Sequence, residues 1–114
     1  MTKSHPGYFD TVNVYYSCVI CHSQLVSHQD VISKAFQGRY GAAYLVENMI
    51  NIMTGKDEDR QLMTGIHTVA DISCRICQTK IGWKYIKTPK ESERYKLGKC
   101  VIEKTRVIKE SLFL

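Results

Sequence analysis

Short apolar-rich segments alternate with turn residues along the whole chain, and this pattern predicts a mainly β protein. Residues 11–17 alternate polar and apolar side chains with the period of a strand and lead directly into Cys18. Further segments rich in Val, Ile and Tyr have strand-like lengths and are separated by turn residues. We predict these additional strands at 31–36, 44–53, 67–73, 81–88 and 100–108.

Two breaks in this pattern predict local structure of another kind. Gly55 is expected to end the third strand, and the charged run 57–60 is expected to form a turn. Pro89 is expected to open a short helical turn over 89–93, because proline suits the first helical position and acidic residues favour the positive helix end. A chain of 114 residues with these elements fits one domain.

Composition argues against a disordered, a membrane-spanning and an exported protein. Hydrophobic residues make up 44% of the chain, too many for a disordered protein. The longest apolar run is far shorter than the roughly 18 residues that a membrane-spanning helix needs, so we expect no membrane insertion. Residues 1–7 lack the apolar core of a signal peptide, and we therefore expect a reducing compartment.

The net charge of +5 comes entirely from the second half of the chain, most densely from Lys80 to Lys109. Such a stretch could contact nucleic acid or an acidic partner. However, the basic residues alternate with Ile and Tyr, as on the solvent face of a sheet, and Glu91, Glu93 and Glu103 interrupt the positive run. Without a recognisable nucleic-acid motif, we do not expect a nucleic-acid partner.

Two Cys-x-x-Cys pairs, Cys18/Cys21 and Cys74/Cys77, form the strongest chemical signal. Zinc prefers four tetrahedral ligands, and each pair follows a predicted strand, as in zinc knuckles at the tips of β-hairpins. Four thiolates leave no open position for water, so one structural zinc ion is predicted. A reducing compartment argues against disulfides, whereas an iron–sulfur cluster with four cysteines stays open as an alternative.

The four histidines are expected to be surface or hydrogen-bonded residues rather than ligands. His22 follows Cys21 directly, and His67 precedes the second cysteine pair, but neither has ligand spacing with a second residue.

The cysteine spacing and several single residues together resemble the Yippee family of small eukaryotic zinc-binding proteins, over nearly the whole chain. The segments Ser33–Gly38 and Ala70–Ile72 also look like that family. One departure is Cys100, which stands where the family has a bulky apolar residue. The positions that match the family pattern are Cys18, Cys21, Gly41, Leu45, Asn51, Gly65, Cys74, Cys77, Gly82–Tyr85, Lys96 and Glu103.

The resemblance implies a β-tent, in which two antiparallel sheets are pinned at one end by one zinc ion. Proteins with related folds are the ligand-binding domain of cereblon, the centromere-licensing Mis proteins and the methionine-R-sulfoxide reductases. It further implies an N-terminal extension over 1–10 and a single zinc-binding domain over 11–114. The family is also linked to cell division and growth. We therefore expect a non-enzymatic protein-interaction module in the nucleus and/or the cytoplasm, with CTLH/GID-type ubiquitin ligase subunits as candidate partners.

Two other functions follow from single residues. Cys100 lies on a late predicted strand among lysines, as a reductase-like nucleophile would, but Ile102 replaces the Asn of the reductase motif and no resolving cysteine is left. The other function is that of a small-ligand binder with a partial aromatic pocket, for which Trp83 and Tyr85, on one strand face, are the candidate ligand- or partner-binding residues. They are expected either to line a shallow groove or, by a small margin, to fill the core between the sheets.

Overall fold

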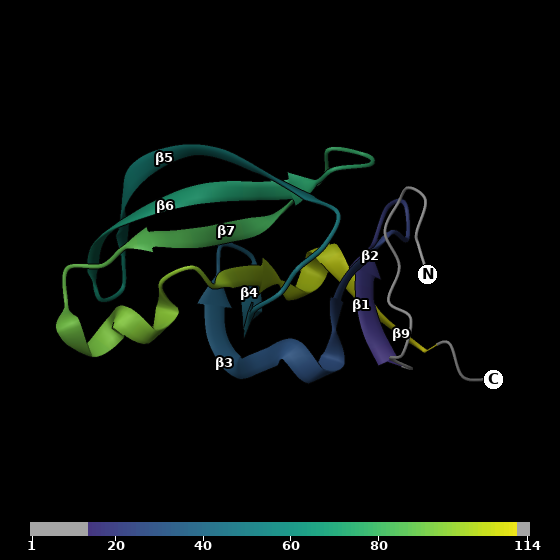
Figure 1. Ribbon diagram of the computed structural model, residues 1–114, viewed down its shortest axis with the longest axis horizontal. Coiled ribbons are helices and arrows are strands. Elements are labelled where there is room, and N and C mark those ends of the chain that lie inside the picture. Colours follow the sequence, from purple (N-terminus) through teal and green to yellow (C-terminus); the bar gives the residue numbers. More distant parts are fainter. Residues whose placement is uncertain (1–13, 112–114) are drawn as a thin grey trace.

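The computed structural model describes residues 14–111, in which two antiparallel sheets are connected (Figure 1). The predicted extension 1–10 and residues 11–13 of the first predicted strand lie outside the described residues. The small sheet has the strand order β2-β1-β9 and the large sheet the order β3-β4-β8-β7-β6-β5. The strands are β1 Val14–Cys18, β2 Gln24–Ser27, β3 Val31–Gly38, β4 Gly41–Val46, β5 Ile52–Leu62, β6 Gly65–Cys74, β7 Lys80–Lys87, β8 Cys100–Glu103 and β9 Val107–Ser111.

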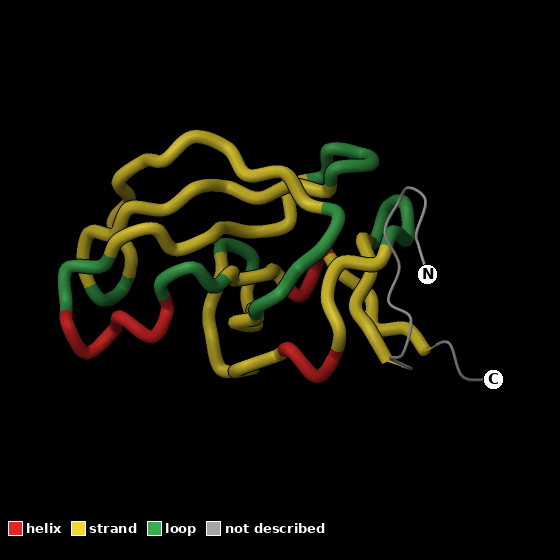
Figure 2. The backbone as a smooth tube through the Cα atoms, viewed as in Figure 1, coloured by secondary structure: helices red, strands yellow, loops and turns green. Residues whose placement is uncertain are grey.

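Three short 3₁₀ helices connect these strands within the described range, as the red segments of Figure 2 show. They are η1 His28–Asp30, η2 Glu91–Lys96 and η3 Lys104–Arg106. The predicted helical turn after Pro89 is therefore confirmed, although it begins at Glu91. No helix in the described part of the chain is long and apolar enough to cross a membrane.

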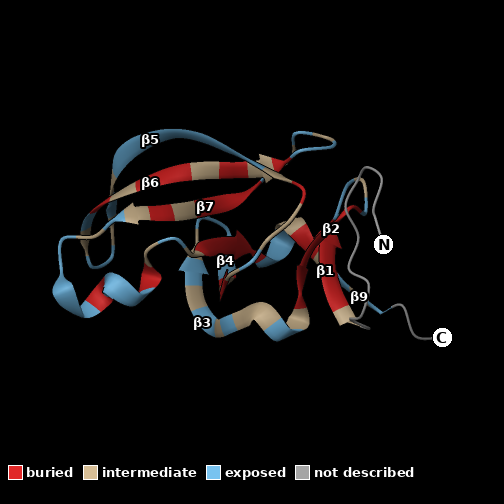
Figure 3. Ribbon diagram, viewed as in Figure 1, coloured by how far each residue is buried: buried red, intermediate tan, exposed pale blue. Residues whose placement is uncertain are grey.

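The large sheet buries side chains on both faces, because successive residues of a strand point to opposite sides. On β8, Cys100 and Ile102 pack with residues of the small sheet in one core cluster. Val101, between them, packs with Trp83 and Tyr85 in a second cluster on the other face. Figure 3 shows the resulting buried strands β4, β6 and β7 next to the exposed strands β3 and β5.

The prediction of one strand over 44–53 is wrong. β4 ends at Val46, a loop follows, and β5 begins at Ile52. Within this loop, Asn48 and Asn51 have left-handed backbone angles, with φ of 57° and 59°, which no strand accommodates. The apolar residues of this segment therefore belong to two different strands.

The charged turn predicted at 57–60 is also wrong, since these residues continue β5. Gly55 does not end the strand but lies beside a register irregularity between Thr54 and Asp57. β5 is an edge strand with mostly exposed side chains, so the apolar alternation that reveals a half-buried strand is missing.

The predicted strand over 100–108 is divided between the two sheets. β8 pairs with β4 and β7 in the large sheet, η3 follows, and β9 pairs with β1 in the small sheet. The short strand β2 was not predicted. Segments 31–36 and 67–73 are confirmed as parts of β3 and β6, and segment 81–88 is confirmed as β7 except for Thr88, since β7 ends at Lys87.

Candidate metal centre and aromatic groove

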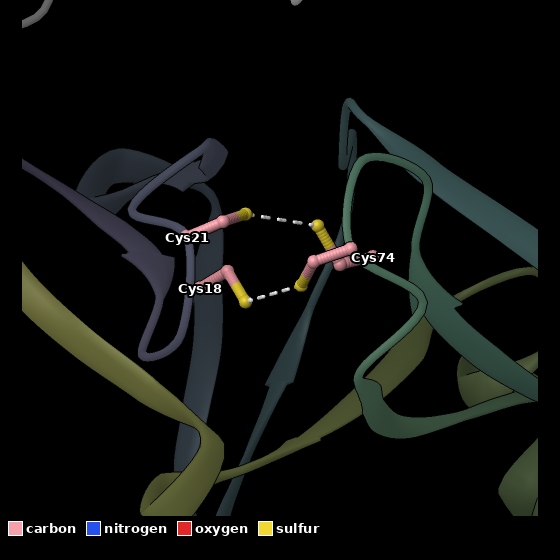
Figure 4. Close-up of side chains that lie close together, drawn as sticks. Cys18, Cys21 and Cys74 are labelled. Carbon is pink, nitrogen blue, oxygen red and sulfur yellow. Dashed lines mark hydrogen bonds between the residues drawn. The ribbon is translucent and has the colours of Figure 1, made fainter.

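Four cysteine sulfurs converge where the two sheets meet (Figure 4). Cys18 ends β1 and Cys74 ends β6, and Cys21 and Cys77 lie in the turns that follow. All four sulfurs lie within 4.8 Å of one another, and the distances Cys18–Cys77 and Cys21–Cys74 are 3.6 Å. Tetrahedral zinc with Zn–S bonds near ~2.3 Å separates its sulfurs by about 3.8 Å, so this arrangement fits one zinc ion.

The two Cys-x-x-Cys turns have the same backbone geometry. His22 N–H donates to the Cys18 carbonyl at 2.8 Å, and Gln78 N–H donates to the Cys74 carbonyl at the same distance. His22 and Gln78 both have a φ of 64°. Each turn thereby reverses the chain directly after its second cysteine and directs two sulfurs to one side.

Hydroxyl side chains support each turn in the same way. Ser23 Oγ lies 3.2 Å from the Cys21 sulfur, and Thr79 Oγ1 lies 3.1 Å from the Cys77 sulfur. Sequence reasoning missed both residues. Their signal is nevertheless visible, because each cysteine pair is followed at the second position by a hydroxyl residue.

The thiols of Cys18, Cys74 and Cys77 differ in pKa before metal binds. Burial raises the pKa of Cys74 to about 12 and also raises the pKa of Cys18. A hydrogen bond from Thr79 holds the pKa of Cys77 down at about 6. Zinc binds thiolates, so a bound ion would displace the protons of the buried pair and leave a closed, structural sulfur shell.

Asn51 connects the second cysteine turn to the small sheet. Its Nδ2 donates to the Gln24 carbonyl in β2 at 2.8 Å. Its side-chain oxygen accepts from Arg75 Nη2 at 2.9 Å, and its backbone oxygen accepts from Arg75 N–H at 2.8 Å. Arg75 lies between Cys74 and Cys77, so this one asparagine fixes the distance between the two halves of the metal centre.

Neither histidine that flanks a cysteine pair joins the sulfur cluster. His22 Nδ1 lies 3.1 Å from Glu110 Oε2 on β9, and Glu110 also accepts from Ser17. His67 is buried, with Nε2 3.0 Å from Glu93 Oε1. Among the described residues, the cluster that could hold a metal consists of the four cysteines alone.

Cys100 lies inside the core between the sheets, in surroundings that do not favour a reactive thiolate. It is buried and packs with the apolar cluster shared by the two sheets. Burial raises its pKa to about 11, although Lys84 acts in the opposite direction. A thiol of this kind stays protonated at neutral pH and is a poor nucleophile.

Trp83 and Tyr85 lie on the face of the large sheet that is turned away from the small sheet. Both are buried in a core cluster, as the favoured prediction of core packing has it, but this cluster contains no residue of the small sheet and so does not lie between the sheets. Both line a groove of about 950 Å³, which extends over β3, β5, β7 and η2. Phe36, Tyr40 and Tyr95 contribute further aromatic rings to its walls.

A buried polar network closes one end of this groove. Glu93 Oε1 accepts from Thr64 at 2.8 Å and lies 3.0 Å from His67 and 3.1 Å from Lys96 Nζ. Burial alone would raise the pKa of Glu93, but these hydrogen bonds outweigh it and hold the pKa at about 2. The Lys96 ammonium in turn lies 5.4–5.9 Å from the ring centres of three aromatic side chains, namely Phe36, Tyr85 and Tyr95.

Comparison with known proteins agrees with this geometry. The family described as "Yippee zinc-binding/DNA-binding /Mis18, centromere assembly" matches residues 14–112. A yippee-like protein of Arabidopsis thaliana is 50% identical over 95 residues, which are 83% of this chain and 90% of that protein. Human protein yippee-like 3 is 44% identical over 109 residues, covering 96% of this chain and 92% of its own.

Among solved structures, the crystal structure of the Mis18 'Yippee-like' domain has the same fold. Its TM-score is 0.68 at 13% sequence identity, and the match covers 90% of this chain and 99% of that domain. The fold of two antiparallel sheets and the single zinc ion expected from the sequence are therefore both confirmed. The chain belongs to the Yippee-Mis18 family of zinc-binding domains.

Proposed function

We propose that this protein is a non-enzymatic interaction module, in which zinc holds the two sheets together and the groove of the large sheet contacts a protein partner. The observation that carries this proposal is the groove itself. It measures about 950 Å³ and is lined by aromatic side chains on the sheet face that the small sheet leaves uncovered. Apolar and aromatic surface of this kind commonly supplies the anchors of protein interfaces.

The state of the cysteines supports a role without catalysis. The four paired cysteines have the spacing of a closed zinc shell, which leaves no position for substrate. Cys100, the fifth cysteine, is buried with a raised pKa and does not line the groove. The reductase-like alternative therefore has no accessible nucleophile among the described residues. The names of the relatives likewise mention no enzymatic activity.

The partner, the cellular location and the biological process are proposed from the family resemblance. We propose subunits of a CTLH/GID-type ubiquitin ligase as partners, and the nucleus and/or the cytoplasm as the location. A role in cell division and growth belongs to the same proposal, and the family description mentions centromere assembly.

Affinity purification of the full chain from cell extract, with mass spectrometry, tests the interaction module. Tyr40 and Tyr95 line the groove and are exposed, so the double variant Tyr40→Ser/Tyr95→Ser should lose the specific partners. Ile32→Ser/Ile66→Ser is the matched control, because both residues are also exposed but neither lines the groove. Capture of the same proteins by wild type and by the double variant would contradict a role of the groove.

A small-ligand binder is the second candidate function, and one observation favours it. Trp83 lines the groove, and its indole nitrogen is buried without a hydrogen-bond partner of regular geometry among the described residues. Buried polar groups normally have a partner, so this nitrogen fits a ligand that carries an acceptor. Mass spectrometry of the protein released from cells under non-denaturing conditions would reveal such a ligand as a constant added mass.

A further inference from the structure

We propose that the groove binds a short acidic segment of the partner protein, with one acceptor oxygen of that segment on the Trp83 indole N–H. This inference rests on the proposed interaction module and names the chemistry of its partner. Three features of the groove carry it: an unpartnered donor in its floor, unpaired cations on its walls and an internal cation that excludes basic ligands.

The donor is the first feature. Trp83 is only 9% exposed, and its Nε1 makes no hydrogen bond of regular geometry within the described residues. The indole N–H still acts on the Tyr85 hydroxyl, whose pKa it lowers against the larger effect of burial. Tyr85 packs edge-on against the indole with ring centres 6.3 Å apart. A buried indole N–H without a partner costs free energy, and a carbonyl or carboxylate oxygen from a ligand would remove that cost. A ligand with a hydrogen-bond acceptor would therefore be favoured at Trp83.

The charges are the second feature. Five cationic residues line the groove but only two acidic ones, Asp71 and Glu103. Asp71 pairs with Arg60 and Lys80, and Glu103 accepts from the backbone N–H groups of the turn that follows β3. The cations that line the groove are Arg39, Arg60, Lys80, Lys96 and Arg106.

Two of these cations keep their charge available for a ligand. Neither Arg39 nor Arg106 forms an ion pair with another described residue, and the Arg106 guanidinium lies 5.1 Å from the centre of the exposed Tyr40 ring. An anionic side chain at either arginine would supply the counter-charge that the described residues do not. The groove wall therefore complements a negative segment.

Lys96 is the third feature. Its ammonium already lies over Phe36, Tyr85 and Tyr95, in the position that an external lysine, methyl-lysine or arginine would need for cation–π contact. Glu93 holds it there at 3.1 Å. A basic peptide would have to displace this internal ion pair, whereas an acidic peptide would not.

The shape of the groove favours a peptide over nucleic acid. The indole of Trp83 is almost fully covered, so it offers its N–H rather than a free ring face on which a base could stack. The family description also mentions DNA binding, so duplex DNA is included as the rival ligand in the binding test below. Exposed Met63, at 91% of its free accessibility, adds apolar contact at the rim that suits an acidic segment with apolar residues.

Fluorescence titration of the zinc-loaded full chain tests the proposal, because Trp83 is the one tryptophan of the sequence. The probes are a peptide of alternating Glu and Leu, the same peptide with Gln for Glu, one with Lys for Glu, and duplex DNA. The Glu peptide should bind at least about tenfold more tightly than the others and shift the Trp83 emission. Equal binding of the Gln peptide, tighter binding of the Lys peptide or DNA, or no binding by any probe would overturn the proposal.

Variants test the assigned contacts. Arg39→Gln/Arg106→Gln should weaken the Glu peptide by about tenfold and flatten its salt dependence. Lys87→Gln/Lys90→Gln removes the same charge outside the groove and should change affinity less than about twofold. Trp83→Phe keeps a ring but removes the donor and should also weaken the peptide. If Trp83→Phe fails to fold, the affinity of Arg39→Gln/Arg106→Gln for the Glu peptide still tests the proposal.

The two proposals fail in different ways. If cell extract yields no specific protein partner, the interaction module itself is wrong. If partners are captured but Arg39→Gln/Arg106→Gln retains them, and excess Glu peptide does not release them, the module stands and the acidic segment is wrong.

Discussion

Gly82 lies where β7 passes β8 so closely that no side chain fits. A Cβ added there would lie 1.8 Å from the Val101 carbonyl oxygen and 2.9 Å from its carbonyl carbon. Because both contacts are to backbone, neither strand can yield without losing its pairing. We therefore predict that Gly82→Ala destabilises the fold by about 3 kcal/mol or more, seen as loss of soluble protein and of unfolding cooperativity.

Gly55→Ala is the matched control for Gly82→Ala. A Cβ at Gly55 would meet only the Asp71 carbonyl oxygen, at an ordinary 3.5 Å. The variant should stay within about 1 kcal/mol of wild type in denaturant unfolding. Equal loss in both variants would show that the close approach at Gly82 is not what excludes a side chain.

Asn51 allows a second prediction at the scale of one residue. Asn51→Gly keeps the left-handed backbone angle but removes the side-chain bonds to Gln24 and Arg75. We expect the variant to lose about 1–3 kcal/mol of stability and to release zinc to a chelator more readily. Asn48→Gly removes only an exposed bond to Asp30 at a similar backbone angle and should retain wild-type zinc affinity.

The role of single residues could be predicted from the sequence only where it follows from their spacing along the chain. Cys18 and Cys74 could be placed in one metal site because each begins a Cys-x-x-Cys pair after a predicted strand. Asn51 has no such local signal, since its partners lie 27 and 24 positions away. Its role becomes visible only when the fold brings β2 and the second cysteine turn together.

At the scale of elements, η2 is fixed to the large sheet chiefly by Glu93, whose carboxylate meets Thr64, His67 and Lys96. Glu93→Gln removes the negative charge and leaves the buried Lys96 ammonium without its counterion. We predict a loss of about 1–3 kcal/mol in denaturant unfolding and weaker protection of η2 amides in hydrogen exchange. Glu91→Gln is the control in the same helix, because Glu91 is exposed.

The pH dependence of this effect follows from the low pKa of Glu93, about 2. A carboxyl whose pKa is lower in the folded than in the unfolded state stabilises above the unfolded value, near ~4.3, and loses that contribution as the pH falls toward 2. The stability difference between wild type and Glu93→Gln should therefore shrink as the pH falls from about 5 toward 2. A difference that stays unchanged over this range would contradict the low pKa of Glu93.

Elements were predictable where one face is buried and the other is exposed or where a cysteine pair ends the strand. β6, for example, alternates buried and partly exposed residues up to Cys74. Residues 57–60 of β5 were mistaken for a turn because successive charged side chains here are exposed or only partly buried. At a sheet edge, such charges discourage pairing with another chain, so the same residues that conceal the strand in the sequence protect it in the structure.

At the scale of the molecule, the metal centre connects β1 of the small sheet to β6 of the large one. Zinc binding contributes on the order of 10–16 kcal/mol, compared with roughly 5–15 kcal/mol for the stability of a whole domain. Cys18→Ser or Cys74→Ser should therefore give poorly soluble protein, and chelation should unfold the native chain. Circular dichroism with elemental analysis should show one zinc per folded chain.

Cys100→Ala serves as the control for the ligand variants. It removes one buried sulfur from the core but leaves all four sulfurs of the metal centre in place. The protein should remain folded and retain its zinc, with a stability loss of about 1–2 kcal/mol. Zinc loss in this variant, or iron in place of zinc in the wild type, would contradict the assignment of the centre.

The fold class and the metal centre could be predicted from strand patterns and cysteine spacing, but the connection between the sheets could not. Residues 100–108 contain neither Gly nor Pro, so nothing in the segment marks the point where the chain leaves one sheet for the other. η3 makes this transition with Lys104–Arg106, whose side chains would also suit an exposed strand. Tertiary packing decides between the two conformations.

The central position of β1, between β2 and β9, has a consequence for biosynthesis. Ser17 on β1 bonds Glu110 on β9 across 93 positions of the sequence. On the ribosome, β1 and the first cysteine pair therefore leave the exit tunnel long before β9 and the second cysteine pair are translated. Until then the nascent chain carries two unliganded thiols and an incomplete sheet. Metal acquisition therefore waits for the second cysteine pair, and closure of the small sheet waits for Val107–Ser111.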